Sequence, residues 1–256
     1  MTGTFTLAHI SDLHLSPEYR RQNIQGVRRL LDFLATQPID HIVITGDIAA
    51  NADRRDFALA RMLLSSHGLL DASRTTIIPG NHDIFGGVHT AEDILEFPSR
   101  CRKTNVELAL EDFTKSFAEL FQGCAIGGKG HPYPFVKDLG PVVLIGLNSV
   151  ADYSVVKNPL GSNGQVTESQ ILKVREYLES GLPKEKTRIV LVHHHFNKAD
   201  KPATGVLGGM WGSLEQQTMK LRKKRSLLEF FQKEQIDLVL HGHLHVSSSY
   251  TRKGIR

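Results

Sequence analysis

An apolar run followed at once by glycine and aspartate stands at His41-Ile-Val-Ile-Thr-Gly-Asp47. Runs of four to six residues that are rich in Val, Ile and Leu, and bounded by Gly, Pro or Asp, are typical of strands buried on both faces. The same kind of run recurs along the chain, so we expect further buried strands at Phe5–Ile10, Thr75–Ile78, Val142–Leu147, Arg188–Val192 and Ile236–Leu240.

Helical patterns separate these runs. Apolar residues recur at helical spacing between residues 24 and 34, and helices also fit residues 53–66 and 107–121. Two stretches, Thr167–Gln170 and Ser226–Glu229, have the form of a capping box and predict two later helix starts. Strands that alternate with helices favour α/β layers with largely parallel pairing. We interpret the Gly- and Pro-bearing segments 85–105, 123–134 and 196–212 as loops at a substrate rim.

The composition is that of a globular protein. Of 256 residues, 40% are hydrophobic and 23% charged, which excludes a disordered chain. The only cysteines are Cys101 and Cys124, so a disulfide scaffold is disfavoured and a reducing cytoplasm is expected. We find no targeting segment, and the apolar stretches are too short to span a bilayer. The net charge of +4 is too small by itself to imply nucleic acid. The distinctive figure is 13 histidines.

Residues that can bind metal follow five of the six predicted strands. In open α/β sheets, ligands bind at the carboxyl ends of the parallel strands. In an extended backbone, residues i and i+2 share a face, so the Asp12/His14 and His243/His245 pairs can each present two side chains to one site. In chain order the candidates are Asp12 and His14, then Asp47, then Asn81, His82 and Asp83, then His193, His194 and His195, then His241, His243 and His245.

This donor set favours a pair of metal ions. Mixed oxygen and imidazole ligands suit Mn, Fe, Co, Ni or Zn better than Mg or Ca. Seven ligands exceed what one tetrahedral ion needs, whereas two ions that share a carboxylate about 3.5–4 Å apart would use them all.

Five short blocks carry a resemblance to a known family. The blocks Asp12-Leu-His14, Gly46-Asp47, Gly80-Asn81-His82-Asp83, the histidine run from His193, and Gly242-His243-Leu-His245 resemble those of the calcineurin-like metallophosphoesterase superfamily, in order and spacing. The resemblance implies a four-layer α/β/β/α sandwich with a two-metal site at one edge. We expect one such domain over residues 1–256.

The resemblance also implies a role for each residue. Asp12, His14 and His245 would hold one metal. Asn81, His193 and His243 would hold the other, and Asp47 would bridge both. His82 would face the substrate as a catalytic residue. The register of the histidine run stays open: His193 is preferred because it directly follows the strand, and His194 is the alternative.

The implied reaction is hydrolysis of a phosphate ester by a hydroxide shared between two Mn, Fe or Zn ions. His82 is expected to help the leaving group, and Asp83 to orient His82 or to cap the turn. The spacing resembles bacterial cyclic-nucleotide and glycerophosphodiester phosphodiesterases, so a small phosphodiester is the expected substrate. A phosphomonoesterase or a nucleotide pyrophosphatase is the alternative within the fold.

Other classes of function remain open at this point. A metal-free scaffold is one, and a nuclease or nucleic-acid-binding protein that uses the basic run Lys220–Arg225 is another. That run is more typical of a solvated helix face, so nucleic acid is a disfavoured partner. The chain ends eleven residues after His245, whereas relatives continue with further strands. We therefore expect that this sequence is truncated or that it relies on a partner there, and we expect a homo-oligomer as a separate possibility.

Overall fold

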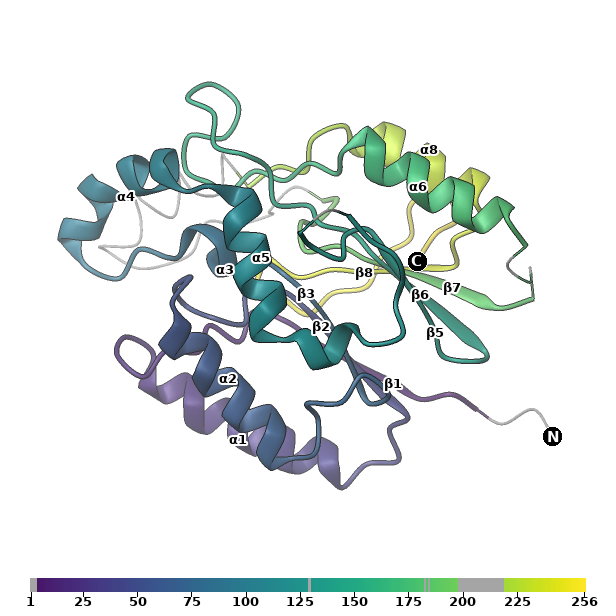
Figure 1. The fold of residues 1–256 in the computed structure, drawn as a ribbon, viewed down its shortest axis with the longest axis horizontal. Helices are drawn as coiled ribbons and strands as arrows, with labels where there is room; N and C mark the ends of the chain where they lie inside the picture. The colour runs from purple at the N-terminus through teal and green to yellow at the C-terminus, as the bar shows by residue number, and fades with distance from the viewer. Residues whose placement is uncertain (1–3, 129, 182, 184, 198–218) are drawn as a thin grey trace.

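The computed structural model describes residues 4–128, 130–181, 183, 185–197 and 219–256. Its strands form two sheets (Figure 1). The first sheet is parallel, in the order β1 (Leu7–Ile10), β2 (His41–Thr45) and β3 (Thr75–Ile78). The second has the order β4 (Ala125–Ile126), β5 (Phe135–Asp138), β6 (Val142–Gly146), β7 (Thr187–Leu191) and β8 (Leu238–Leu240). Only the pairings of β5 are antiparallel in this sheet.

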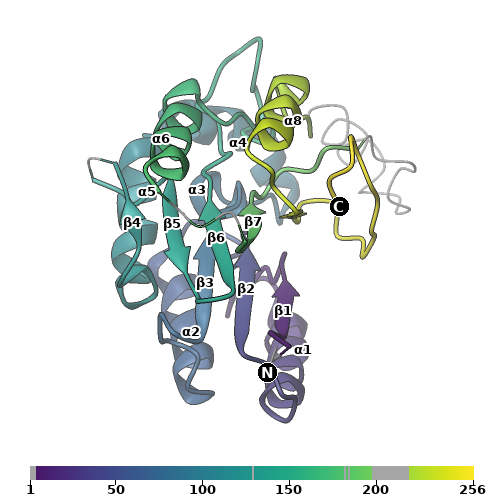
Figure 2. The ribbon, with the colours of Figure 1, turned by 90° about the vertical axis from the view of Figure 1, so that its right-hand side faces the viewer.

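Helices cover the outer faces of both sheets. Figures 1 and 2 show α1 and α2 against the first sheet, and α6 and α8 on the opposite side of the molecule against the second. The helical elements are α1 (Arg21–Ala35), α2 (Arg54–Ser66), α3 (His82–Phe85), α4 (Ala91–Lys103), α5 (Val106–Ser116), the 3-10 helix η1 (Ala118–Phe121), α6 (Glu168–Glu179) and α8 (Lys224–Lys233). No helix in the described part of the chain is long and apolar enough to cross a membrane.

Alternation along the central strands produces the layers. In β2, Ile42 and Ile44 belong to the core cluster beneath α1 and α2, whereas Val43 belongs to the cluster between the sheets. In β6, Val143 packs in the cluster with α6 and α8, whereas Leu144 joins Val43 between the sheets. Both faces of β2 and β6 are therefore buried, and the chain has the expected four-layer α/β/β/α architecture.

The apolar runs located the central strands well. The predicted segments at β2 and β3 have the observed bounds, and the others agree within three residues. Strands β4 and β5 were missed. Strand β4 has only two residues, and β5 carries Lys137, which is buried because its ammonium donates to the carbonyls of Ala72, Thr75 and Leu120 at 2.8–3.2 Å.

The expectation of a loop over residues 85–105 was wrong. Helix α4 occupies most of it, beginning at a capping box in which Thr90 and Asp93 bond each other's backbone N–H. An Asp in place of the usual Glu or Gln, and Pro98 within the helix, hid this signal. The predicted helix over 107–121 is divided into α5 and η1. Of the predicted loop over 196–212, residues 198–212 lie outside the described residues.

One predicted helix start was right, although the Gln170 side chain bonds the backbone of Asn148 and does not complete the capping box, and the other start was wrong. The Thr167 side chain accepts from the backbone N–H of Gln170 at the start of α6. Helix α8 instead begins at Lys224, and this places Ser226 inside the helix. The four-residue pattern alone cannot distinguish a cap from an interior serine, because the residues before it decide where the helix begins.

These two positions form a matched pair for a stability test. We expect Thr167→Ala to lower the free energy of unfolding by about 1 kcal/mol, because an orphan N–H at the helix start loses its acceptor. Ser226→Ala should change it by less than about 0.5 kcal/mol. Urea unfolding of both variants measures the difference. A larger loss for Ser226→Ala would contradict the observed start of α8.

Candidate metal centre

The loops that follow β1, β2, β3, β7 and β8 meet at one place, and their backbones are joined directly. Asp12 N–H donates to Gly46 O at 3.0 Å, and Gly242 N–H donates to His193 O at 3.1 Å. The backbone N–H of His243 donates to the Asp12 carboxylate at 3.0 and 3.1 Å. Because both sheets contribute their strand ends, residues from opposite ends of the sequence share one site.

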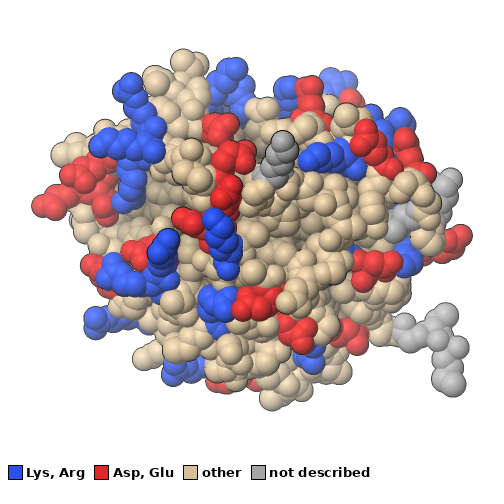
Figure 3. All heavy atoms as spheres, viewed as in Figure 1, with Lys and Arg blue, Asp and Glu red and all other residues tan. Residues whose placement is uncertain are grey.

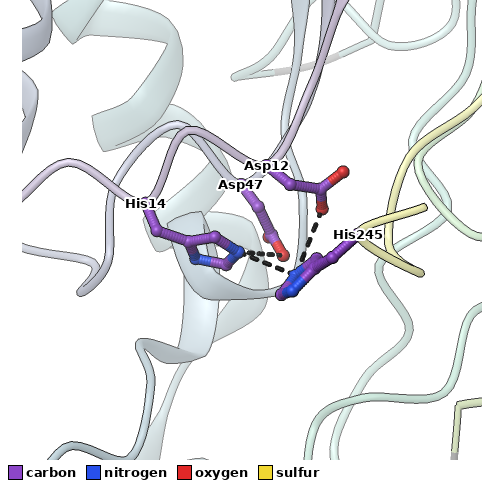
Figure 4. Close-up of side chains that lie close together, drawn as sticks. All are labelled: Asp12, His14, Asp47 and His245. Carbon is purple, nitrogen blue, oxygen red and sulfur yellow. Dashed lines mark hydrogen bonds and ion pairs between the residues drawn. The ribbon is translucent and has the colours of Figure 1, made fainter. Parts of the chain in front are cut away.

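The first group of side chains is Asp12, His14, Asp47 and His245 (Figure 4), whose ligand atoms all lie within 4.8 Å of one another. His14 Nε2 lies 2.9 Å from His245 Nε2 and 3.9 Å from an Asp47 oxygen. His245 Nε2 lies 3.7 Å from an Asp12 oxygen.

The second group consists of Asp47, His193 and His243, again within 4.8 Å of one another, with Asn81 beside them. His193 Nε2 lies 3.3 Å from Asp47 Oδ2, 3.1 Å from Asn81 Oδ1 and 3.1 Å from His243 Nδ1. The other ring nitrogen, Nδ1, lies 2.8 Å from the Thr45 carbonyl and therefore carries a proton. In the neutral ring, Nε2 thus presents a lone pair toward further acceptors.

The carboxylate, amide oxygen and ring nitrogens of the second group face one another, and a positive charge among them would stabilise this arrangement. Burial opposes a charge on His193, yet Asp47 raises the pKa of His193 to about 9. Burial likewise opposes a charge on Asp47, but His193 and the other nearby histidines hold its pKa well below the usual range. A divalent cation would supply this charge, and carboxylate, amide and imidazole donors are the ligands that transition metals accept. The residues present therefore fit a metal in each group.

The backbone at these positions is strained. Five of the candidate ligands adopt positive φ although none is glycine: Asp12 (57°), His14 (43°), Asp47 (52°), His243 (79°) and His245 (53°). Such conformations cost of order 1–3 kcal/mol each and concentrate at functional sites. Because Gly80 has no side chain, its loop can approach the loop of Asp47 closely; a Cβ at Gly80 would lie 2.1 Å from Asp47 Oδ1.

His82 lies beside the two groups without being a member of either. Its backbone N–H donates to Asp47 Oδ1 at 2.8 Å, and its ring packs edge-on against His14 with centroids 4.6 Å apart. Its Nδ1 faces the Ala50 carbonyl at 3.2 Å, so Nδ1 is the protonated nitrogen of the neutral ring. This arrangement fixes the ring at the edge of the site, and the side chain is only partly buried.

The structure separates the two histidines that the sequence left open. His193 lies in the second group, whereas His194 is not a member: its Nδ1 lies 2.8 Å from Ser149 Oγ, and its ring packs against that of His243 with centroids 4.5 Å apart. Neither group includes His195 or His241. The partners that orient the rings, Thr45 and Ser149, come from distant segments, so the local sequence contained no signal for them.

Asp83 caps its own turn, one of the two roles that the sequence suggested, and it also bonds the loop after β2. Its carboxylate is 1% exposed and accepts from Ala49 N at 2.9 Å and Gly80 N at 2.8 Å. Asp83 thereby ties the loop that carries Asp47 to the loop that carries Asn81. Burial and the charge of Asp47 raise its pKa to about 7.

Comparison with known proteins agrees with this geometry. Residues 5–247 match the family described as calcineurin-like phosphoesterase, and the chain belongs to that family. No curated protein matches the sequence.

Solved structures resemble the fold at low sequence identity. A dimetal phosphatase from Danio rerio superposes with a TM-score of 0.58 at 12% identity, over 94% of this chain and 82% of that chain. A phosphopantetheinyl hydrolase from Mycobacterium tuberculosis gives a TM-score of 0.45 at 15% identity, over 98% and 86%. At this identity the first likeness supports the fold alone.

The histidine register can be tested by metal content. We expect His193→Ala to hold about one Mn²⁺ fewer than the unaltered protein, because the second group loses a donor. His194→Ala is the matched control and should retain the full content. Elemental analysis of Mn²⁺-loaded, gel-filtered protein measures both. The reverse order would make His194 the ligand.

Metal uptake should also release a proton. With a pKa raised from 6.5 to about 9, His193 is protonated at pH 7.5 in the metal-free protein, and a cation must displace that proton. We expect about one proton per protein from this ring between about pH 6.5 and 8, about half as much near pH 9, and a release that vanishes at higher pH. Calorimetry in buffers of different ionisation enthalpy measures the release. Heats that do not depend on the buffer would contradict it.

Proposed function

We propose that this phosphoesterase hydrolyses small phosphodiesters with two metal ions held by Asp12, His14, Asp47, Asn81, His193, His243 and His245. The observation that carries this proposal is the position of Asp47, which belongs to both groups of donors. A carboxylate shared in this way is what a pair of ions about 3.5–4 Å apart requires. The mixed nitrogen and oxygen donors favour Mn, Fe or Zn.

Two bound ions would neutralise phosphate oxygens and make a water molecule acidic enough to attack phosphorus at neutral pH. A side chain of the protein would then protonate the leaving group. His82, held by the Ala50 carbonyl through Nδ1, donates a proton from Nε2 to the departing alkoxide when its ring is doubly protonated. Asn81 contributes a neutral oxygen, which keeps the second group less negative than an aspartate would.

The preference for diesters rests on the spacing of the motifs, which resembles that of bacterial cyclic-nucleotide and glycerophosphodiester phosphodiesterases. The Danio rerio relative is a phosphatase by its title, and for this reason monoesters belong in the same test.

Nucleic acid is not favoured as a partner. The basic run at the start of α8 is largely paired, since Lys223 lies 2.7 Å from Glu168 and Arg225 lies 3.2 Å from Glu229. The Lys224 ammonium donates to the Phe196 carbonyl at 3.1 Å. On the face shown in Figure 3, basic and acidic side chains are interspersed over α6 and α8. Within the described residues, these three side chains therefore offer little of the unpaired basic surface that phosphate backbones require.

We also propose a cytoplasmic location, because Cys101 and Cys124 are both free thiols, as in a reducing compartment. We also propose, from the sequence alone, that the protein forms a homo-oligomer.

The hydrolysis itself gives a direct test. Mn²⁺-loaded protein should cleave bis(p-nitrophenyl) phosphate faster than p-nitrophenyl phosphate, and EDTA should abolish both rates. Asp47→Asn should lower turnover and metal content together, because it weakens both groups. His82→Ala should lower turnover by about 10²–10⁴-fold while metal content is retained.

Two outcomes would contradict the proposal. Loss of metal from His82→Ala as complete as that from Asp47→Asn would contradict its role beside the metals. Faster cleavage of the monoester would replace the proposed diester preference with a phosphatase activity.

A further inference from the structure

A stacked pair of aromatic rings lies next to the metal centre on the side of His82. Tyr19 and His89 are nearly parallel, with an interplanar angle of 11° and centroids 4.6 Å apart. Tyr19 is nevertheless 43% exposed, so much of its side chain is open to a ligand although one face of its ring lies on His89. The proposed reaction assigns no role to this pair.

Close packing connects the pair to the catalytic histidine. His82 packs on His14, and a Cβ at Gly87 would lie 2.7 Å from His82 Nδ1, so the segment leading to His89 lies directly against that ring. The carboxamide oxygen of Asn51 accepts from Gly87 N at 3.3 Å and from His89 Nε2 at 3.1 Å. His89 is thereby held immediately beyond His82.

Tyr19, Asn51 and His89 each follow a loop that carries candidate ligands. Tyr19 follows the loop of Asp12 and His14, where the buried Ser16 hydroxyl accepts from its backbone N–H at 3.4 Å. Asn51 follows Asp47, and its backbone N–H donates to Asp56 at 2.9 Å. His89 follows Asn81 and His82. The pair is thus positioned by the same strand ends that position the metal centre.

Tyr19, His89 and Asn51 line a cavity of about 380 Å³, a volume in the range of small-molecule sites; the candidate ligands and His82 lie outside this lining. Its arginines are already paired, because Arg55 lies 3.2 Å from Asp53 and Arg100 lies 3.7 Å from Asp93. Burial lowers the pKa of His89, and Arg20 and His82 lower it further, so its ring is uncharged at neutral pH. The cavity therefore suits an uncharged group better than a second phosphate.

We propose that Tyr19 and His89 determine substrate specificity by stacking a flat, uncharged ring of the nucleobase class, while the attached phosphodiester occupies the metal centre. This inference rests on the proposed hydrolysis of phosphodiesters and adds the chemical class of the ester. Stacking suits this role because every base has a π-face, and the polar rim that includes Asn51 accommodates the edge of the ring.

A matched pair of substrates isolates the ring. The methyl ester of adenosine 5′-phosphate and the methyl ester of 1-O-methylribose 5-phosphate share charge and sugar and differ in the base alone. We expect kcat/KM of the Mn²⁺-loaded protein to favour the first by about tenfold or more. Tyr19→Ala should remove most of this preference through KM, and Tyr19→Phe should retain it because stacking needs only the ring.

Controls separate specificity from folding. Metal content of Tyr19→Ala should equal that of the unaltered protein. Phe33→Ala removes another exposed aromatic side chain, 59% exposed on α1 and outside the cavity lining, and should leave the preference unchanged. Equal rates on the two esters, or a preference that survives Tyr19→Ala, would overturn the proposal.

Binding distinguishes this failure from failure of the proposed function. If metal-loaded protein cleaves neither these esters nor bis(p-nitrophenyl) phosphate, the phosphodiesterase proposal is wrong. Calorimetric titration of both esters into EDTA-treated protein then tests the stacking pair without turnover. Tighter binding of the adenosine ester, lost in Tyr19→Ala, would support the pair, and equal binding of the two esters would overturn it.

Discussion

The buried carboxylate of Asp47 is the constraint on which the site depends. It is 1% exposed, receives the backbone N–H of His82 at 2.8 Å, and lies 3.3 Å from His193 and 3.9 Å from His14. Burying a carboxylate is costly unless positive charge and hydrogen bonds compensate. Without metal, protonated His193 supplies this positive charge, and a cation on each side of Asp47 would supply it in place of that proton. Asp83 supports this arrangement by joining the Asp47 loop to the Asn81 loop.

The layered fold holds these donors close together and maintains the strained backbone of the loops that carry them. Parallel strands end at one edge, and the two sheets bring together residues separated by more than 230 positions, such as His14 and His245, whose Nε2 atoms are 2.9 Å apart. Strands packed on both faces are rigid, and the strain of the positive φ angles at the loops is maintained by the cores on either side. Tyr19 and His89, which form the stacked pair, follow two of these loops in the sequence.

Sequence alone could predict the central strands and the identity of the candidate ligands, because both depend on local pattern. Strands β2 and β3 have apolar runs with sharp Gly or Pro boundaries, and the donors directly follow them. What could not be predicted depends on distant partners. The orientations of the His193 and His194 rings depend on Thr45 and Ser149, the burial of Lys137 on three carbonyls, and the bond between Asp83 and the loop after β2 on Ala49.

The central claim is that two cations share Asp47, and anomalous diffraction from a crystal of Mn²⁺-loaded protein tests it most directly. The account predicts two anomalous peaks about 3.5–4 Å apart, one beside His14 and His245 and the other beside His193 and His243, with the Asp47 carboxylate between them. A single peak, or a peak coordinated by His194 in place of His193, would contradict it.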